Sequence, residues 1–357
     1  MGNTQIFPVQ TAHPVPVYKH YSMKEFRFAI VGCGKIAGRH AAQIAGVGKL
    51  VAVCDIDPQK AADLAGRYQA IAYLNIENLL AHQHDLDVVS ICTPNYMHAD
   101  HAIACLRAGL HVLCEKPLAI SMTDARRMQA AAEASGKKLF VVKSTRFNPP
   151  VQILHNLIRE GRLGTLYSFQ LSCFWNRPAA YYADSWRGGL ATDGGTLFTQ
   201  FSHYIDVLFW LIGDVKECWS LRRNFAHQQV IEFEDTGAAV VEMENSVIGT
   251  INYSINCHAK NMEISLVVIG EKGTVKIGGE YLNKLEYQQI QDFCIPAPEA
   301  GNEANDYGLY RGSMGNHKEV YENLVKALND PRHPFTDVET GMKTIGIIEK
   351  MYMSPVQ

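Results

Sequence analysis

The segment VGCGKIAGRH contains the glycines of a dinucleotide-binding turn, between an apolar run and a small-residue helix. Gly32 suits a tight turn and Gly34 lets backbone N–H groups approach a pyrophosphate, while Lys35 and Ile36 open the helix whose N-terminus favours phosphate. The next apolar run ends at Asp55, at the spacing of the acid that bonds the adenosine ribose and repels a 2′-phosphate. The pattern predicts an NAD site and disfavours NADP.

A second set of chemically active side chains lies in the segment GGTLFTQFSHYIDVLFWLIGD, whose apolar positions recur at helical spacing. Thr199 and His203 are four positions apart and Asp206 is three further on, so all three can lie along one stripe of the helix. In that arrangement Asp206 could orient the imidazole for proton transfer. A lone histidine on such a helix is usually structural, so a structural and a catalytic role of His203 both stay open at this point.

Polar residues follow three apolar runs that read as strands of a parallel sheet. They are Thr93-Pro94-Asn95, Glu115-Lys116-Pro117 and Ser144-Thr145-Arg146. Ligands of such sheets bind beyond the carboxyl ends of the strands, so we expect these clusters to share a cleft. Taken singly, each is equally a helix-entry turn or a surface charge pair. The expected cofactor contacts here are Thr93, Pro94, Asn95, His98, Glu115, Lys116 and Arg146.

The elements that position these residues divide the chain into two kinds of structure. Residues 26–147 alternate apolar runs with helical segments, which predicts an α/β Rossmann domain with a doubly wound parallel sheet. Residues 148–357 contain alternating strands with hairpin turns, which predicts an α+β domain with a large, mostly antiparallel, open-faced sheet. Residues 1–25 are expected to form an irregular extension, and residues 291–305 a polar loop.

Composition excludes several classes of function. The chain has 47% hydrophobic and 19% charged residues and a net charge of -3. It therefore lacks the excess of basic residues that binds nucleic acid or an anionic membrane. The nine cysteines form no C-x-x-C pair, which favours a reducing cytoplasm. No metal-ligand spacing is visible among the histidines and cysteines, so no metal is expected.

The segment SCFWNRPAAYYADSWRGG offers groups for binding a sugar. Arg177 and Arg187 could pair with a carboxylate or a diphosphate, and Tyr182 and Trp186 offer ring faces. For each aromatic residue alone, core or interface packing is the better interpretation. The arginines are the stronger candidates, because two cations flanking an aromatic stretch are seldom needed for packing.

From Phe26 onward the chain resembles the Gfo/Idh/MocA oxidoreductases, through VGCGKIAGRH, CDID, CTPNYMHADHA, CEKPLA, STRFNPP, TQFSHYIDVL and IGEKGTVKIGG. The resemblance implies a Rossmann domain that binds NAD(P), an active-site lysine at Lys116, a histidine at His203, and final helices that pack back on the Rossmann domain. Where the family often has Asp or Asn, four residues before that histidine, this chain has Thr199. Within the family it is most similar to dehydrogenases that oxidise UDP-N-acetylglucosaminuronic acid at C3 for bacterial surface polysaccharides.

The expected reaction is NAD-dependent oxidation of a secondary alcohol, with hydride passing to the nicotinamide. His203 is the expected base and Lys116 the group that polarises the oxygen, although Lys116 could take the proton itself. Thr199 is the third catalytic candidate. The expected substrate contacts are Lys116, Arg177, Tyr182, Trp186, Arg187, Thr199 and His203.

Several alternatives and partners stay open. The substrate could instead be a free sugar or polyol, as in inositol-type or glucose-type enzymes of the family. A non-catalytic dinucleotide sensor would have no use for Lys116 together with His203. A homo-oligomer, dimer or tetramer, is expected through the C-terminal sheet. Whether NAD stays tightly bound is left open.

Overall fold

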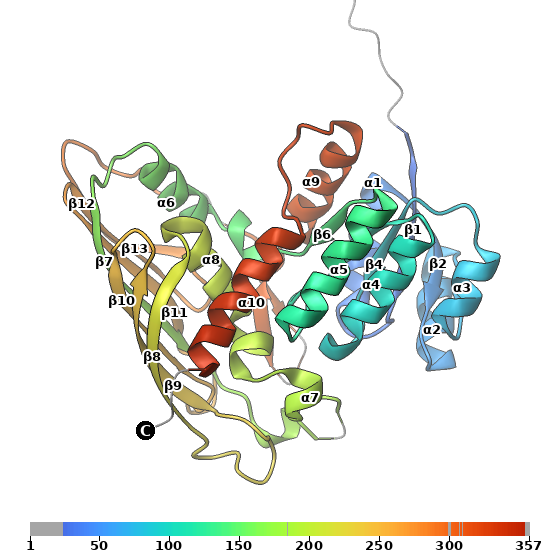
Figure 1. Ribbon diagram of the computed structural model, residues 1–357, viewed down its shortest axis with the longest axis horizontal. Coiled ribbons are helices and arrows are strands. Elements are labelled where there is room, and N and C mark those ends of the chain that lie inside the picture. The colour runs from blue at the N-terminus through green and yellow to red at the C-terminus, as the bar shows by residue number, and fades with distance from the viewer. Residues whose placement is uncertain (1–23, 184, 299–300, 307, 309, 354–357) are drawn as a thin grey trace, which may run out of the picture.

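The computed structural model describes residues 24–183, 185–298, 301–306, 308 and 310–353 (Figure 1). Most of the expected N-terminal extension, residues 1–23, lies outside this range. Within it, no helix is long and apolar enough to cross a bilayer. All nine cysteines are free, and the reducing cytoplasm that they favour stays a prediction.

The first sheet is parallel and has six strands in the order β3-β2-β1-β4-β5-β6. Its strands are β1 Phe26–Val31, β2 Gly48–Cys54, β3 Ile71–Tyr73, β4 Val88–Ile91, β5 His111–Cys114 and β6 Leu139–Val141. The connecting helices are α1 Ala37–Val47, α2 Pro58–Tyr68, α3 Ile76–His82, α4 His98–Arg107 and α5 Met122–Ser135. Because helices cover both faces, the central strands β1 and β4 are mostly apolar and buried, with Arg27 and Ser90 as their polar residues. The predicted doubly wound sheet is confirmed, and its strand order reverses between β1 and β4.

The second sheet has seven strands in the order β13-β12-β11-β7-β10-β9-β8, and only the β10–β7 pair is parallel. Its strands are β7 Leu166–Phe174, β8 Val215–Arg223, β9 Thr236–Met243, β10 Ile248–Ser254, β11 Glu263–Gly270, β12 Gly273–Gly278 and β13 Lys284–Ile290. One face carries α6 Pro149–Arg159, α8 Ser202–Ile212 and α10 Val338–Met353, and the other is uncovered (Figure 1). The predicted open-faced, mostly antiparallel sheet is confirmed.

Alternation along these strands decides which side chains enter the core. Ala239, Ile251 and Leu171 are cross-strand neighbours on the covered face, and all are buried. Trp219 and Val240 are neighbours on the opposite face, and both are more than half exposed. A period of two therefore separates a buried face from an exposed apolar one.

The end of the chain returns to the first sheet. Helix α9, His317–Asn329, packs against α1, and α10 packs against α5 as well as α8 (Figure 1). The short strands β14 Ala304–Asp306 and β15 Arg311–Met314 precede α9. The division expected near residue 147 falls between β6 and α6, and it stays a prediction because α10 contacts both sheets and α9 returns to the first one.

Candidate active site

The glycine turn after β1 has the shape of a phosphate cradle. Gly32 has a φ of +95°, and a Cβ there would lie 2.6 Å from the carbonyl carbon of Cys92. Nothing lies within 4 Å of a Cβ built on Gly34, so its backbone faces open space. No side chain caps the N-terminus of α1, where Ile36 is the N-cap and the exposed Lys35 precedes it. Open backbone and uncapped N–H groups fit a pyrophosphate.

Asp55 lies directly after β2 and holds this turn. Its Oδ2 accepts a hydrogen bond of 2.6 Å from the Cys33 N–H, and its Oδ1 accepts one of 2.9 Å from the Asp57 N–H. The carboxylate is half-buried, and it sits beside the turn where an adenosine ribose is expected.

Asp55→Ala is expected to weaken the preference for NADH over NADPH by roughly 10- to 100-fold, because the like charge that opposes a 2′-phosphate is removed. Fluorescence titrations with both cofactors would measure the two Kd values. Asp63→Ala, which removes an exposed carboxylate of α2, is the matched control. An unchanged ratio in the Asp55 variant would show that this carboxylate does not set cofactor choice.

The loop after β4 is joined to the loop after β5 through His98. The ring nitrogens of this buried histidine lie 2.9 Å from the Thr93 carbonyl oxygen and 2.7 Å from that of Pro117. Pro94 precedes the helical turn Asn95–Met97. The Asn95 amide Nδ2 donates to the Thr199 Oγ1 at 2.7 Å, which ties the first sheet to the segment before α8. The cofactor contacts predicted for these residues stay predictions.

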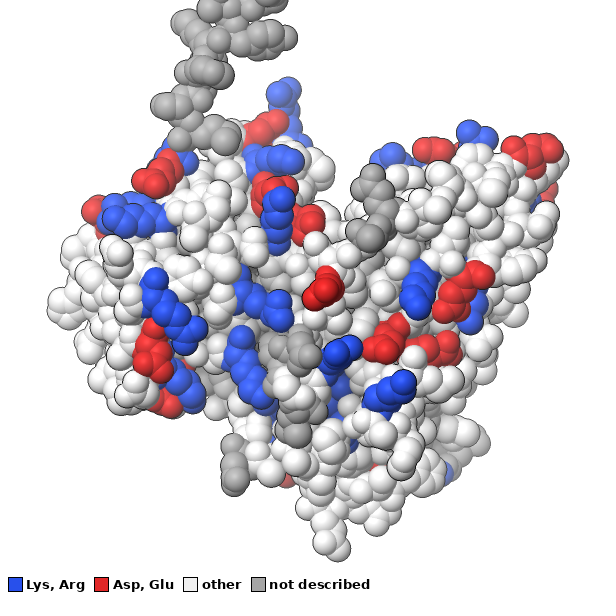
Figure 2. Space-filling model, turned by 180° about the vertical axis from the view of Figure 1, so that it is seen from behind, with Lys and Arg blue, Asp and Glu red and all other residues white. Residues whose placement is uncertain are grey.

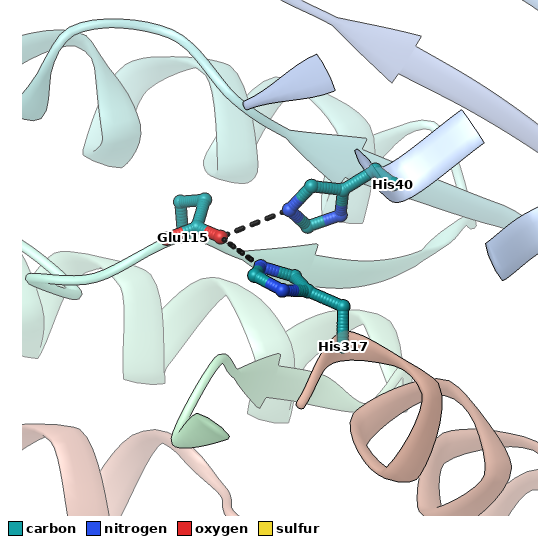
Figure 3. Close-up of side chains that lie close together, drawn as sticks. All are labelled: His40, Glu115 and His317. Atoms are coloured by element: carbon teal, nitrogen blue, oxygen red, sulfur yellow. Dashed lines mark hydrogen bonds and ion pairs between the residues drawn. The ribbon is translucent and has the colours of Figure 1, made fainter. Parts of the chain in front are cut away.

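Glu115, at the end of β5, lies between two histidines (Figure 3). Its Oε1 is 2.9 Å from His40 Nε2 of α1 and 3.3 Å from His317 Nε2 of α9. Burial alone would raise the pKa of Glu115, but hydrogen bonds from His317 and His40 outweigh it and hold that pKa well below its ordinary value. Its Oε2 accepts the Lys116 N–H at 3.0 Å. Glu115 therefore links the backbone of Lys116 to α1 and α9.

This trio escaped the sequence analysis because its members are far apart in the chain. His40, Glu115 and His317 are separated by 75 and 202 positions, yet their ligand atoms lie within 4.8 Å of one another. Hydrogen bonds to the carboxylate account for the arrangement, and His40 Nδ1 lies 2.8 Å from the Tyr321 hydroxyl. The expectation that the chain needs no metal stays a prediction.

Lys116 and His203 come together at the junction of the two sheets. The half-buried Lys116 donates from Nζ to the Thr199 carbonyl oxygen at 3.0 Å. Burial lowers its pKa, and the positive charges of Arg187 and Arg177 lower it further, against the effect of Glu115. His203 is buried, and burial together with the Lys116 charge holds its pKa well below the ordinary value. At neutral pH the imidazole is therefore uncharged and able to accept a proton.

The carboxylate of Asp206 has partners other than His203. It pairs with Arg146 at 2.7 and 2.8 Å and with Lys143 Nζ at 2.9 Å, and it accepts a hydrogen bond from Thr344 Oγ1 of α10. Lys143 and Arg146 therefore bind the carboxylate that, from the helical spacing, could have oriented the imidazole of His203. In this structure the Arg146 guanidinium binds Asp206. The cofactor contact predicted for Arg146 stays a prediction. His203 Nε2 instead lies 3.3 Å from the Ser313 hydroxyl.

Arg177 and Arg187 lie among aromatic rings. The guanidinium of Arg177, 2% exposed, lies over the rings of Trp175, Tyr181 and Tyr310. That of Arg187 lies 4.8 Å from the ring centres of both Tyr181 and Trp186. Among the described residues, the Tyr182 hydroxyl and Arg187 Nε are buried without a hydrogen-bond partner, so both can still bind a ligand.

Four residues at or near the site were missed by the sequence analysis: Asp193, Tyr310, Ser313 and His317. Tyr310 also lies beneath Lys35 of the dinucleotide turn, with Nζ 5.4 Å from the ring centre. Tyr310, Ser313 and His317 reach the site through long-range packing, and Asp193 reaches Thr199, six positions on, through a turn at two glycines, so no helical or strand spacing marks any of them. The glycine-rich stretch before α9 was the one available signal for the last three.

A Rossmann sheet with an open phosphate cradle, a lysine that follows one of its strands and an uncharged histidine on a helix packed against a second sheet together define an NAD-dependent oxidoreductase. The comparisons agree with this class. Residues 26–143 match the model of the oxidoreductase family with an NAD-binding Rossmann fold, and residues 151–276 match the Gfo/Idh/MocA C-terminal domain. The chain belongs to the Gfo/Idh/MocA family, and it is an NAD-dependent dehydrogenase of the group that acts on sugars and polyols.

Two similar solved structures are WlbA dehydrogenases in complex with NADH and UDP-GlcNAcA. The one from Bordetella pertussis is 32% identical with a TM-score of 0.82, and the match covers 93% of this chain and 96% of that one. The one from Chromobacterium violaceum is 34% identical with a TM-score of 0.83, over 93% and 94%. An inositol 2-dehydrogenase of Saccharopolyspora erythraea is 27% identical over 70% of this chain and 72% of its own.

A further relative acts on a carboxylated ring. It is the 1-carboxy-3-chloro-3,4-dihydroxycyclohexa-1,5-diene dehydrogenase of Comamonas testosteroni, 34% identical over 63% of this chain. The match spans 56% of that relative's length.

Proposed function

We propose that this dehydrogenase oxidises a secondary alcohol of an anionic sugar, and specifically C3 of UDP-N-acetylglucosaminuronic acid in the synthesis of a bacterial surface polysaccharide. The observation that carries the proposal is the charge of Arg177. Its hydrogen-bond partners in the described part of the chain are neutral oxygens, from Gln200, Asn176, Asn261 and Arg311. A buried cation without a carboxylate partner is costly, so an anionic ligand nearby would be favoured.

The wider charge pattern supports the same substrate class. Arg177 and Arg187 both act on Lys116 electrostatically, and the exposed Lys35 lies close to the ring of Tyr310, which Arg177 also contacts. Figure 2 shows several Lys and Arg side chains in the middle of one face, with Asp and Glu side chains among them. A uronate carboxylate and a diphosphate are the anions that such cations bind well. The two WlbA neighbours were solved with a ligand of this kind.

The proposed reaction uses His203 and Lys116 in complementary roles. NAD, when bound, accepts the hydride at the nicotinamide C4. His203, uncharged because it is buried, takes the proton of the substrate hydroxyl. Lys116 donates a hydrogen bond to the same oxygen and stabilises its developing negative charge. Thr199 supports Lys116 through its carbonyl oxygen.

The test is turnover of a substrate panel with NAD, followed by absorbance of the reduced nicotinamide. We expect turnover of UDP-N-acetylglucosaminuronate and far slower turnover of UDP-N-acetylglucosamine, which lacks the carboxylate. Turnover of only myo-inositol or glucose would favour a polyol or free-sugar dehydrogenase, the class of the Saccharopolyspora relative. Binding of NADH with no turnover of any member would favour the sensor function.

We also propose that the chain forms a dimer or tetramer through the uncovered face of the second sheet. The strand register places exposed apolar side chains on that one face: Trp219, Leu221, Val240, Ile248, Ile269 and Tyr287. Large apolar side chains exposed on one face of a sheet favour an interaction site there. Val240→Lys is expected to shift the chain to monomer in light scattering, whereas Lys49→Ala, an exposed change on β2, is not. A monomeric wild type would refute this proposal.

A further inference from the structure

Asp193, the last residue of α7 Leu190–Asp193, is a buried carboxylate beside Lys116 that the proposed reaction does not yet use. Its Oδ2 accepts the Gly188 N–H at 3.0 Å, and its Oδ1 accepts the hydroxyl of Thr199. Both oxygens act as acceptors, as those of a carboxylate anion do. Burial raises the pKa of Asp193 above its ordinary value, although the hydrogen bonds from Thr199 and Gly188 and the charges of Arg187 and Lys116 oppose that effect.

Thr199 connects this carboxylate to the lysine. Its hydroxyl has one proton, which it donates to Asp193, and it accepts a hydrogen bond from Asn95 Nδ2. The hydroxyl therefore has no proton left for a substrate, and it cannot act as a base. The carbonyl oxygen of the same residue accepts the hydrogen bond of Lys116 Nζ at 3.0 Å. Asn95 also donates to the Asp193 carbonyl oxygen at 3.0 Å, which closes the cluster.

We propose that Asp193 is a positioning residue that acts on Lys116 through Thr199, and that it supplies from α7 the carboxylate absent at position 199. Its negative charge keeps Lys116 protonated and aimed at the substrate oxygen. The inference deepens the proposed function, since it rests on Lys116 being the group that contacts the reacting alcohol. Asp193 itself contacts neither cofactor nor substrate in this scheme.

The first test measures the titration of Lys116 without any substrate. Competitive labelling with a trace of acetic anhydride, from about pH 6 to about pH 11, gives the pKa of a single lysine when the labelled peptides are separated by mass spectrometry. We expect Asp193→Asn to lower the pKa of Lys116 by about one unit or more, because an adjacent opposite charge is lost. Asp100→Asn, an exposed carboxylate of α4, is the matched control and is expected to leave it unchanged.

The second test uses the pH profile of kcat with whichever substrate the wild type turns over. In Asp193→Asn, kcat is expected to fall roughly 10- to 100-fold. The alkaline limb of the pH profile, where Lys116 loses its proton, is expected to move to lower pH. Adding Thr199→Asp to that variant returns a carboxylate to the site and is expected to restore much of the loss. A purely structural role for Asp193 would lower the yield of folded protein without moving the limb.

The outcomes separate the two proposals. Absence of turnover by the wild type counts against the proposed function, whereas an unmoved Lys116 pKa in folded Asp193→Asn overturns the role of Asp193. If Asp193→Asn does not fold, Asp193→Ser decides alone, because it also removes the negative charge and keeps a side-chain oxygen for the Thr199 hydroxyl. A Lys116 pKa equal to that of the wild type in this variant overturns the inference.

Discussion

Lys116→Ala is expected to reduce kcat by roughly 100- to 10,000-fold, the range that a positioned acid or base contributes. The side chain is held at 3.0 Å from the Thr199 carbonyl oxygen, beside an uncharged histidine, so its loss removes the donor that steadies the reacting oxygen. The phosphate cradle at Gly32 and Gly34 is formed by backbone and does not depend on this ammonium. NADH affinity is therefore expected to stay within about threefold, under ~1 kcal/mol.

Two measurements on the same preparations check this prediction. Steady-state kinetics with saturating NAD gives kcat, and fluorescence titration gives the Kd of NADH. Lys49→Ala is the matched control, since it removes an exposed lysine of the same sheet. Full turnover in Lys116→Ala would remove this residue from the chemistry, and a large loss of NADH affinity would move its role to cofactor binding.

Asp206→Ala is expected to lower the free energy of unfolding by about 3–5 kcal/mol, since it leaves two buried cations without their counter-charge. Lys143 and Arg146 come from the segment that follows β6 and Asp206 from α8, so the cluster also fixes the helix that carries His203. Urea unfolding followed by circular dichroism measures the change. Asp85→Ala, a carboxylate that is 77% exposed, is the control, with an expected change under about 0.5 kcal/mol.

The pH dependence gives this prediction a second check. Burial tends to raise the pKa of Asp206, but Lys143 and Arg146 outweigh it and lower that pKa to about 2. A depressed carboxylate pKa contributes stability that is present above the unfolded value of about 4 and is lost as the pH falls toward the folded value. The difference between wild type and Asp206→Ala should therefore shrink from pH 7 to about pH 3. An equal difference in the free energy of unfolding at both pH values would contradict the ion-pair explanation.

The parts of the fold and site that the sequence predicted are those with local signals. Gly32 and Asp55 lie within one strand-turn-helix-strand unit, where chain geometry alone fixes their relative position. The alternation of Trp219 and Val240 with buried neighbours follows from the period of two in a sheet covered on one face. Lys116 and His203 were placed together by resemblance to a family, and the structure brings them to the same junction.

The remaining contacts depend on packing between distant elements or on a turn of the backbone. Helical spacing permits contact between Asp206 and His203, but Lys143 and Arg146 of another element compete for that carboxylate with two positive charges. Asp193 reaches Thr199 because the glycines after α7 turn the chain back, with φ values of +88° at Gly194 and +116° at Gly195. Spacing in a single sequence encodes neither outcome, since each is decided by which charged groups meet after folding.

The central claim is hydride transfer from C3 of an anionic sugar nucleotide to NAD. The most direct measurement uses UDP-N-acetylglucosaminuronate deuterated at C3, with mass spectrometry of the reduced cofactor after a single turnover. We expect the reduced nicotinamide to gain one deuterium. Reduced cofactor without deuterium would show that the hydride comes from another position, and a cofactor that stays oxidised would contradict the proposed substrate.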